Sequence, residues 1–187
     1  MKRLFIAIKL IPDDNFLRIY NFLKQNLKHD LIKWVEPDKL HLTLKFLGET
    51  RYDKIPEIKY LLTEFVKGKN PVELNFDKVG IFGSSYDPKV IWFGISNNET
   101  IKQLGIELLQ YFHENGFTQD RQNFVPHLTV GRIKKLVNKK YFQSVINKVK
   151  EEEIQNFNIK EIILYQSILK PTGPIYITLG KYELIKG

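Results

Sequence analysis

The chain of 187 residues is long enough for one large domain or two small lobes, and its 43% of hydrophobic residues can build a buried core. It contains no cysteine, which excludes a disulfide scaffold, thiolate catalysis and any metal site with cysteine ligands. The net charge of +8 favours a polyanionic partner such as RNA, DNA or a nucleotide, although a lysine-rich surface without a partner gives the same excess.

Two hydrophobic periods alternate along the chain and predict its elements. The run RLFIAIKL predicts a buried strand at residues 3–10. This run is too short to span a membrane, and no small-residue cleavage site follows it. We therefore expect a soluble, unprocessed protein without membrane contact, and the lack of cysteine is compatible with the cytoplasm. Residues 12–29 predict an amphipathic helix with Asp13 or Asp14 as its N-cap.

The remaining segments continue this alternation of strands and helices. Helices are predicted at 54–68 and 98–116, each closed by a glycine, and at 138–153. Strands are predicted at 31–35, 39–49, 72–83, 89–96, 126–133, 158–169 and 174–185. Hairpin-like links outnumber helical crossovers in the second half, which favours an α+β fold with antiparallel sheets. No linker divides the sequence, so we expect a single two-lobed domain over 1–187.

Two of the four histidines stand in the same tripeptide, His-Leu-Thr, within KLHLTLKF (39–46) and PHLTVGRI (126–133). Side chains alternate between the two faces of a strand. The first strand therefore presents His41, Thr43 and Lys45 on one face. Its other face is apolar and should enter the core, with Leu42, Leu44 and Phe46.

The second strand places His127 and Thr129 together on one face in the same way. A single histidine beside a threonine is usually structural, but the repetition points to function. Two imidazoles with an ordinary pKa of about 6.5 can serve as a proton donor and a proton acceptor around one reacting centre. Hydroxyl groups can hold the non-bridging oxygens of a phosphate as charge grows on them. The pattern thus suits a cyclic phosphodiester.

The sequence resembles the two-histidine phosphoesterases, and more closely the RNA 2′,3′-cyclic phosphodiesterases, long named 2′-5′ RNA ligases. The resemblance covers nearly the whole chain and rests on RLFIAI, KLHLTLKFLGE, FVPHLTVGRI and LYQSILKPTGPIYITLGKYEL. It implies a bilobal, LigT-like α+β fold with two antiparallel sheets, flanking helices, pseudo-two-fold symmetry and a central cleft. It also implies hydrolysis of RNA 2′,3′-cyclic phosphate ends to 2′-phosphates, with 2′-5′ joining as the reverse reaction.

The resemblance also assigns roles to individual residues. The histidine of the first motif donates a proton to the 3′ leaving oxygen, which falls on His41. The histidine of the second motif accepts a proton from water, which falls on His127. The hydroxyls of Thr43 and Thr129 would bind phosphate oxygens. No cofactor is implied.

An arginine follows the second motif in this family, and here it is Arg132. Strand alternation would turn Arg132 away from the histidine, unless a bulge or strand end at Gly131 returns it to the groove. Arg121 and Lys45 are further phosphate candidates, although Lys45 could equally lie at a groove rim. Aromatic candidates for stacking on a base are Trp34, Trp92, Phe46, Phe82, Tyr86 and Tyr176, of which Phe46 should be in the core.

Other interpretations stay open from the sequence. The same site could act on ADP-ribose cyclic phosphate or a 2′-5′-linked oligonucleotide, and the chain could be an RNA-binding module without catalysis. A metal site is not expected, because no HxxxH, HxH or carboxylate cluster accompanies the histidine pair. His29 and His113 stand near predicted helix ends and should be structural. The expected partner is RNA or a nucleotide with a 2′,3′-cyclic phosphate end, bound by a monomer.

Overall fold

The computed structural model describes residues 1–84, 86–118, 123–171 and 173–185. These residues form four α-helices: α1 (Asp14–Asn26), α2 (Ile55–Phe65), α3 (Glu99–Glu114) and α4 (Lys139–Lys148). They also form nine strands: β1 (Lys2–Lys9), β2 (Leu31–Trp34), β3 (His41–Thr50), β4 (Val72–Gly83), β5 (Pro88–Ile95), β6 (His127–Lys135), β7 (Gln155–Ile159), β8 (Glu161–Lys170) and β9 (Gly173–Glu183). No helix in the described part of the chain is long and apolar enough to cross a membrane.

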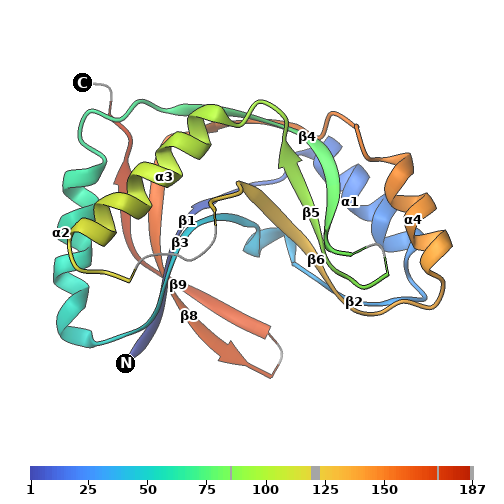
Figure 1. The fold of residues 1–187 in the computed structure, drawn as a ribbon, viewed down its shortest axis with the longest axis horizontal. Coiled ribbons are helices and arrows are strands. Elements are labelled where there is room, and N and C mark those ends of the chain that lie inside the picture. Colours follow the sequence, from blue (N-terminus) through green and yellow to red (C-terminus); the bar gives the residue numbers. More distant parts are fainter. Residues whose placement is uncertain (85, 119–122, 172, 186–187) are drawn as a thin grey trace.

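The strands form a curled antiparallel sheet in the order β7-β4-β5-β6-β3-β1-β8-β9, with β2 added to β6 (Figure 1). One lobe contains β1, β3, β8 and β9 with α2 and α3, and the other contains β2 and β4 to β7 with α1 and α4. The two lobes meet where β3 and β6 pair at Leu42 and Leu128. The two sheets expected from the sequence are therefore the two halves of one sheet, and the α+β class is confirmed.

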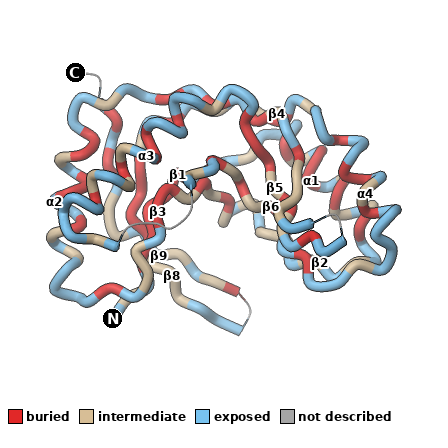
Figure 2. The backbone as a smooth tube through the Cα atoms, viewed as in Figure 1, coloured by how far each residue is buried: buried red, intermediate tan, exposed pale blue. Residues whose placement is uncertain are grey.

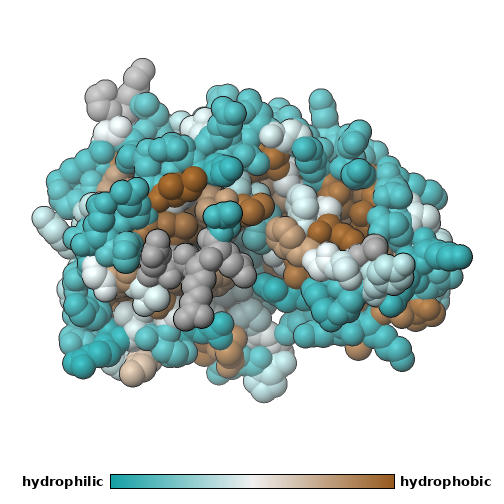
Figure 3. All heavy atoms as spheres, in the orientation of Figure 1, coloured by the Kyte–Doolittle hydropathy of each residue, from teal (hydrophilic) through white to brown (hydrophobic). Residues whose placement is uncertain are grey.

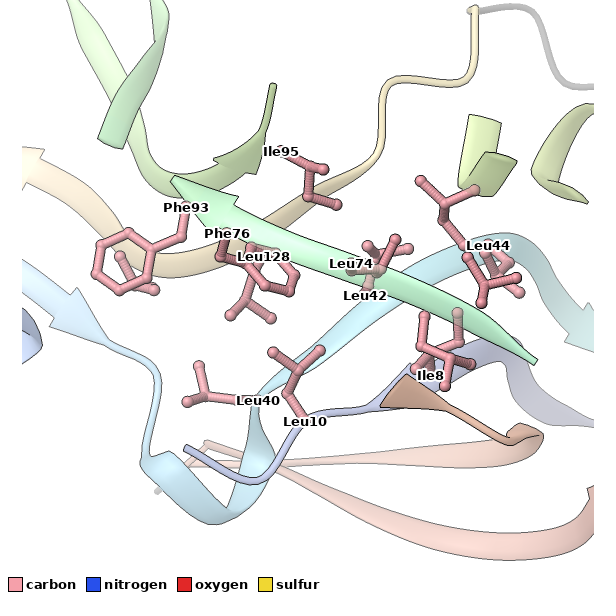
Figure 4. Close-up of a cluster of buried hydrophobic side chains, with 14 of the residues drawn as sticks. Ile8, Leu10, Leu40, Leu42, Leu44, Leu74, Phe76, Phe93, Ile95 and Leu128 are labelled. Atoms are coloured by element: carbon pink, nitrogen blue, oxygen red, sulfur yellow. The ribbon is translucent and has the colours of Figure 1, made fainter. Parts of the chain in front are cut away.

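The main hydrophobic core is continuous across this junction. Buried residues follow the central strands and the inward sides of the helices (Figure 2). Side chains from both lobes meet in it, including Leu42 and Leu44 of β3, Phe76 of β4 and Phe93 of β5 (Figure 4). Because the sheet curls around a shared core, it holds the two histidine strands next to each other.

Local signals in the sequence explain most helix ends. The Asp13 carboxylate accepts a hydrogen bond of 2.8 Å from the Phe16 backbone N–H and caps α1, as predicted. Gly68 and Gly116 follow α2 and α3 with φ of 71° and 83°, a conformation that favours glycine. These caps fix where the helices stop and where the chain turns back to the sheet.

The end of α4 differs from its predicted position. The helix was predicted to run to residue 153, but it ends at Lys148, and the strand β7 that follows was missed. Backbone hydrogen bonds to β4 explain this. The Val79 N–H donates to the Lys150 carbonyl at 3.0 Å, and the Ile154 N–H donates to the Phe76 carbonyl at 2.7 Å. Tertiary pairing thus overrides the helix propensity of KVKEEE.

Candidate active site

Each histidine strand carries a β-bulge at the same point after its His-Leu-Thr tripeptide. In β3, Thr43 pairs with Ala7 of β1, and Lys45 pairs with Ile6. Two residues of β3 thus advance while β1 advances by one, so Leu44 is the extra residue. A bulge of this kind shifts the faces on which the following side chains lie.

The bulge in β6 is built in the same way. Thr129 pairs with Trp92 of β5, and Gly131 pairs with Ile91, which leaves Val130 as the extra residue. The sequence suggested that a bulge at Gly131 could return the next side chain to the groove, and the irregularity lies one position earlier. The two motif strands therefore share their bulge as well as their tripeptide.

These bulges change which side chains face the cleft. In β3 the predicted alternation was wrong for two residues, because Lys45 is only 3% exposed and Phe46 is 63% exposed. The Lys45 ammonium donates a hydrogen bond of 3.1 Å to the Thr118 carbonyl. In β6 the same shift brings Arg132 into the cleft with His127. Arg132 and Phe46 thus occupy equivalent positions in the two lobes.

Both imidazoles are held by a backbone carbonyl two residues before them. Nδ1 of His41 lies 2.7 Å from the Lys39 carbonyl oxygen, and Nδ1 of His127 lies 2.7 Å from the Val125 carbonyl oxygen. A carbonyl oxygen can only accept, so Nδ1 carries the proton in each contact. This leaves Nε2 of each ring as the nitrogen that can accept or donate a proton at the reaction.

Aromatic rings hold the imidazoles from the side. The ring centres of Phe5 and Tyr176 each lie 5.1 Å from that of His41, with Tyr176 packed edge to face at 83°. The Phe82 ring packs edge to face against His127 at 4.7 Å and 88°. This packing restricts the orientation of the two rings and shields them from water.

The pKa of both histidines is lowered by this environment. Burial is the largest cause for His41 and for His127, because it disfavours the charged imidazolium. The positive charge of Arg132 lowers the pKa of both rings further, and a charged His127 also lowers that of His41. The Lys39 and Val125 carbonyls oppose these effects. In the free protein both imidazoles are therefore mainly neutral near neutral pH.

A cleft of about 1490 Å³ opens between the lobes, and the surface is hollowed there (Figure 3). Five side chains predicted to act on a phosphate line it: His41, Thr43, His127, Thr129 and Arg132. The further candidate Lys45 lines it too, although its side chain is almost fully buried. Four of the aromatic candidates line it too, namely Trp34, Phe46, Phe82 and Tyr176. Arg121 lies outside the described residues.

Two of the aromatic candidates lie elsewhere. The Trp92 indole lies over Gly80 and Gly94, and Tyr86 is 80% exposed away from the cleft lining. His113 lies in the last turn of α3 and His29 in the turn after α1, and neither lines the cleft. The structural roles expected for these two histidines agree with these places.

Sequence reasoning missed the groups that orient the imidazoles. The carbonyls of Lys39 and Val125 carry no side-chain signal. Phe5 was read only as part of a buried strand, although its ring contacts His41. The nearest signal was its place in RLFIAI, where alternation would turn Phe5 and Ala7 to the side of β1 opposite Leu4 and Ile6.

The arrangement fits acid–base chemistry on an anion. Two imidazoles of opposite lobes line one cleft, each with its Nδ1 on a backbone carbonyl, and two hydroxyls and a guanidinium accompany them. Hydroxyls and a guanidinium are the donors that bind phosphate oxygens. A phosphate gripped between the strands would meet a proton donor and a proton acceptor.

Comparison with known proteins agrees with this arrangement. A protein-family model described as the 2′-5′ RNA ligase superfamily matches residues 17–170. The RNA 2′,3′-cyclic phosphodiesterase of Methanocaldococcus jannaschii is 38% identical over 180 residues, which cover 96% of this chain and 99% of that protein. The protein of the same name from Methanothermobacter thermautotrophicus is 33% identical over 184 residues, covering 97% of this chain and 98% of that protein.

Solved structures share the fold over almost the whole chain. The crystal structure of TT0787 of Thermus thermophilus has a TM-score of 0.81, with 24% identity over 99% of this chain and 98% of that chain. The crystal structure of Escherichia coli LigT complexed with 3′-AMP has a TM-score of 0.75, with 24% identity over 98% of both chains. The fold of this chain is thus shared with these proteins over almost its whole length.

Proposed function

The chain belongs to the 2′-5′ RNA ligase superfamily, and from this premise we propose that it hydrolyses the 2′,3′-cyclic phosphate at the end of an RNA to a 2′-phosphate. The observation that carries the proposal is the duplicated site, in which two imidazoles line one cleft and each has a backbone carbonyl on its Nδ1, which leaves Nε2 for proton transfer. The names of the relatives from Methanocaldococcus jannaschii and Methanothermobacter thermautotrophicus support the same reaction.

In the proposed reaction, Nε2 of His127 takes a proton from water while the water oxygen attacks phosphorus. The bond from phosphorus to the 3′ oxygen breaks on the opposite side, and Nε2 of His41 gives its proton to that oxygen. The phosphate stays on the 2′ oxygen. After one turnover His127 is protonated and His41 is neutral, so exchange of protons with water restores the starting state.

Charge on the phosphate oxygens grows during this displacement, and three cleft side chains can bind it. The hydroxyls of Thr43 and Thr129 come from opposite lobes and can each donate one hydrogen bond. The guanidinium of Arg132 adds a full positive charge and a planar pair of donors. Donors placed before the reaction starts stabilise a transition state in this way.

Binding of the substrate favours the protonated form of His41. Both imidazoles are mainly neutral in the free protein, since burial and Arg132 lower their pKa. A bound phosphodiester brings a negative charge, which favours the charged imidazolium and raises the pKa again. A protonated His41 therefore forms most readily in the complex, where it is needed.

The test is to incubate the protein with a 2′,3′-cyclic mononucleotide and determine which hydroxyl retains the phosphate. We expect the 2′-phosphate. His41→Ala and His127→Ala should each lower kcat by about 10²–10⁴, the usual contribution of a general acid or base. His113→Ala, which lies outside the cleft, is the matched control and should keep full activity.

Three outcomes would contradict the proposal. Full activity in either cleft variant would remove that histidine from the reaction. If only ADP-ribose cyclic phosphate or a 2′-5′-linked oligonucleotide is cleaved, the site would be a related cyclic phosphodiesterase with another substrate. RNA binding without any turnover would instead indicate a binding module.

A further inference from the structure

The cleft holds far more positive charge than one cyclic phosphate requires. Apart from Lys45, its described lining contains six cationic residues and a single carboxylate, that of Glu36. The six are Arg3, Lys24, Lys33, Lys39, Arg132 and Lys134. Within the described ranges none of these six forms an ion pair. An end with one negative charge cannot balance them, so the cleft fits a polyanion.

Three of the cations form a row that starts at the candidate active site. Lys33 of β2 pairs directly with Arg132 of β6, so their side chains leave the sheet side by side, with Cβ atoms about 5 Å apart. Farther along, Ile32 pairs with Ile133 and Leu31 with Lys135, which leaves Lys134 as an extra residue of β6.

The row leads away from the histidines over a considerable distance. Lys134 is exposed and lies five residues beyond Thr129 in β6. At the rise of a β-strand this corresponds to about 15 Å, which is beyond the reach of one phosphate group. Lys24 of α1 also lines the cleft, with its ammonium 5.2 Å from the centre of the Tyr20 ring.

Apolar side chains of the hairpin of β8 and β9 form another part of the cleft lining. Leu169 and Pro174 pair with each other near its tip and line the cleft together with Tyr176. The tip also approaches the cationic row, because a Cβ at Gly173 would lie 3.8 Å from the Lys33 Nζ. Ammonium groups and apolar side chains therefore lie next to each other in the lining of this space.

We propose that this space binds single-stranded RNA beyond its terminal nucleotide, with upstream phosphates on Lys33 and Lys134 and bases against Leu169 and Pro174. The proposal rests on the proposed function, and names its substrate as an oligonucleotide. A cationic track beside an apolar wall is how proteins bind single strands without reading their sequence. In a duplex the bases are paired inside and cannot meet that wall.

The test compares a 2′,3′-cyclic mononucleotide with a pentanucleotide that ends in the same group. The protein should hydrolyse the pentanucleotide with the higher kcat/KM. Each phosphate contact on a single strand contributes about −0.7 to the slope of log K against log salt. Lys33→Ala with Lys134→Ala should therefore make the slope about 1.4 less negative. Between 50 and 200 mM salt the affinity of the wild type for the pentanucleotide should then fall roughly sevenfold more than that of the double variant.

A matched control removes two charges elsewhere. Lys59→Ala with Lys102→Ala changes exposed lysines of α2 and α3 that do not line the cleft, and it should behave as the wild type. This control variant should also hydrolyse the mononucleotide as the wild type does. Equal kcat/KM and equal salt slopes for both substrates in the wild type would overturn the RNA track while leaving the hydrolysis intact.

Direct binding separates this inference from the proposed function. Fluorescence anisotropy of a labelled single-stranded pentanucleotide needs no turnover, so it remains decisive if neither substrate is hydrolysed. The Lys33 and Lys134 double variant should bind more weakly than the control variant. Equal affinity of these two variants would overturn the proposal, and so would equally tight binding of an RNA duplex or of a polyglutamate peptide.

Discussion

Arg132 acts on both imidazoles at once. Its charge lowers the pKa of His41 and of His127 in the free protein, and its guanidinium lines the same cleft. The two rings are electrostatically coupled as well, because a charge on His127 lowers the pKa of His41. The pH dependence of the reaction therefore belongs to the pair and to Arg132 together.

The profile of kcat/KM against pH should be bell-shaped, with its maximum below the ordinary histidine pKa of about 6.5. Arg132→Gln removes the positive charge, so the pKa of both rings should rise and both limbs should move to higher pH. Arg132→Lys keeps the charge and loses the planar donors. It should leave the limbs in place and lower the rate. If both limbs of the pH profile keep their positions in Arg132→Gln, the charge of Arg132 does not act on the histidines.

Tyr176 offers a second test at this scale, as a positioning residue for His41. Its ring packs edge to face on the imidazole, and such pairs contribute about 0.5–1.5 kcal/mol. Tyr176→Phe keeps the ring and should keep kcat. Tyr176→Ala should lower kcat by up to about tenfold. It should also raise the pKa of His41, because burial is the largest cause of the lowered value.

The readout is again the pH profile of kcat/KM, measured for both Tyr176 variants. In Tyr176→Ala the alkaline limb, which belongs to the proton donor, should move to higher pH. A variant that merely folds poorly would lose amplitude without moving the limb. If Tyr176→Phe is as impaired as Tyr176→Ala, the hydroxyl rather than the ring is what the reaction uses.

At the residue scale the sequence identified five of the polar side chains that line the cleft, but not the groups that orient the histidines. The repeated tripeptide was enough for His41 and His127. Lys45 and Phe46 were assigned to the wrong faces, because nothing in LTLKF marks the bulge. In β6 the resemblance to the family named Arg132, and Gly131 after the bulge indicated how its side chain could return to the groove.

At the scale of elements, the length of a strand or helix depends on what it pairs with. The two bulges and the early end of α4 arise from contacts with β1, β5 and β4, which lie far away in the sequence. The predicted caps, in contrast, depend on neighbours within a few residues. Local chemistry therefore predicted the start of α1 and the ends of α2 and α3, while distant partners decided the registers that orient the site residues.

Gly105 links helix α3 to the second histidine. A Cβ at this position would lie 2.2 Å from the Phe124 ring, and Phe124 directly precedes Val125, whose carbonyl holds His127. In a free helix, glycine to alanine would stabilise by about 1 kcal/mol. Here Gly105→Ala should displace the ring and lower kcat, because the carbonyl moves with it.

This prediction has an internal control in the ring itself. The double variant Gly105→Ala with Phe124→Leu replaces the ring with a smaller side chain, so it should recover part of the kcat that Gly105→Ala loses. Phe124→Leu alone sets the baseline for the missing ring. Kinetic measurements on the four proteins give the coupling between the two positions. Strictly additive losses would mean that α3 does not hold the segment that carries His127.

At the scale of the whole molecule, one core supports both lobes and joins them at Leu42 and Leu128. The sequence predicted two lobes, since each half carries a histidine strand. It did not predict their union into one sheet, because pairing between strands so far apart depends on the assembled core. This shared core keeps the two imidazoles at a fixed spacing, so stability and site geometry are coupled.

The lowered pKa values of the two cleft histidines predict how the stability of the protein depends on pH. The folded-state pKa of His41 and His127 lies below the unfolded value of about 6.5, so between these values the unfolded chain binds more protons. The free energy of unfolding should thus be fully retained above pH 6.5 and should decrease as the pH falls through the folded-state pKa values. Urea denaturation between pH 7.5 and 5.5 measures it.

Replacing both cleft histidines with glutamine removes the groups that are held neutral in the fold. The His41→Gln, His127→Gln double variant should therefore lose less free energy of unfolding than the wild type over this pH range. His113→Gln, outside the cleft, should follow the wild type.

An anion in the cleft reverses the effect by favouring the charged rings. Inorganic phosphate should accordingly stabilise the wild type more at pH 5.5 than at pH 7.5, and the double variant should not show this difference between the two pH values. An equal pH dependence in the wild type and the double variant would mean that neither ring is held neutral by the fold.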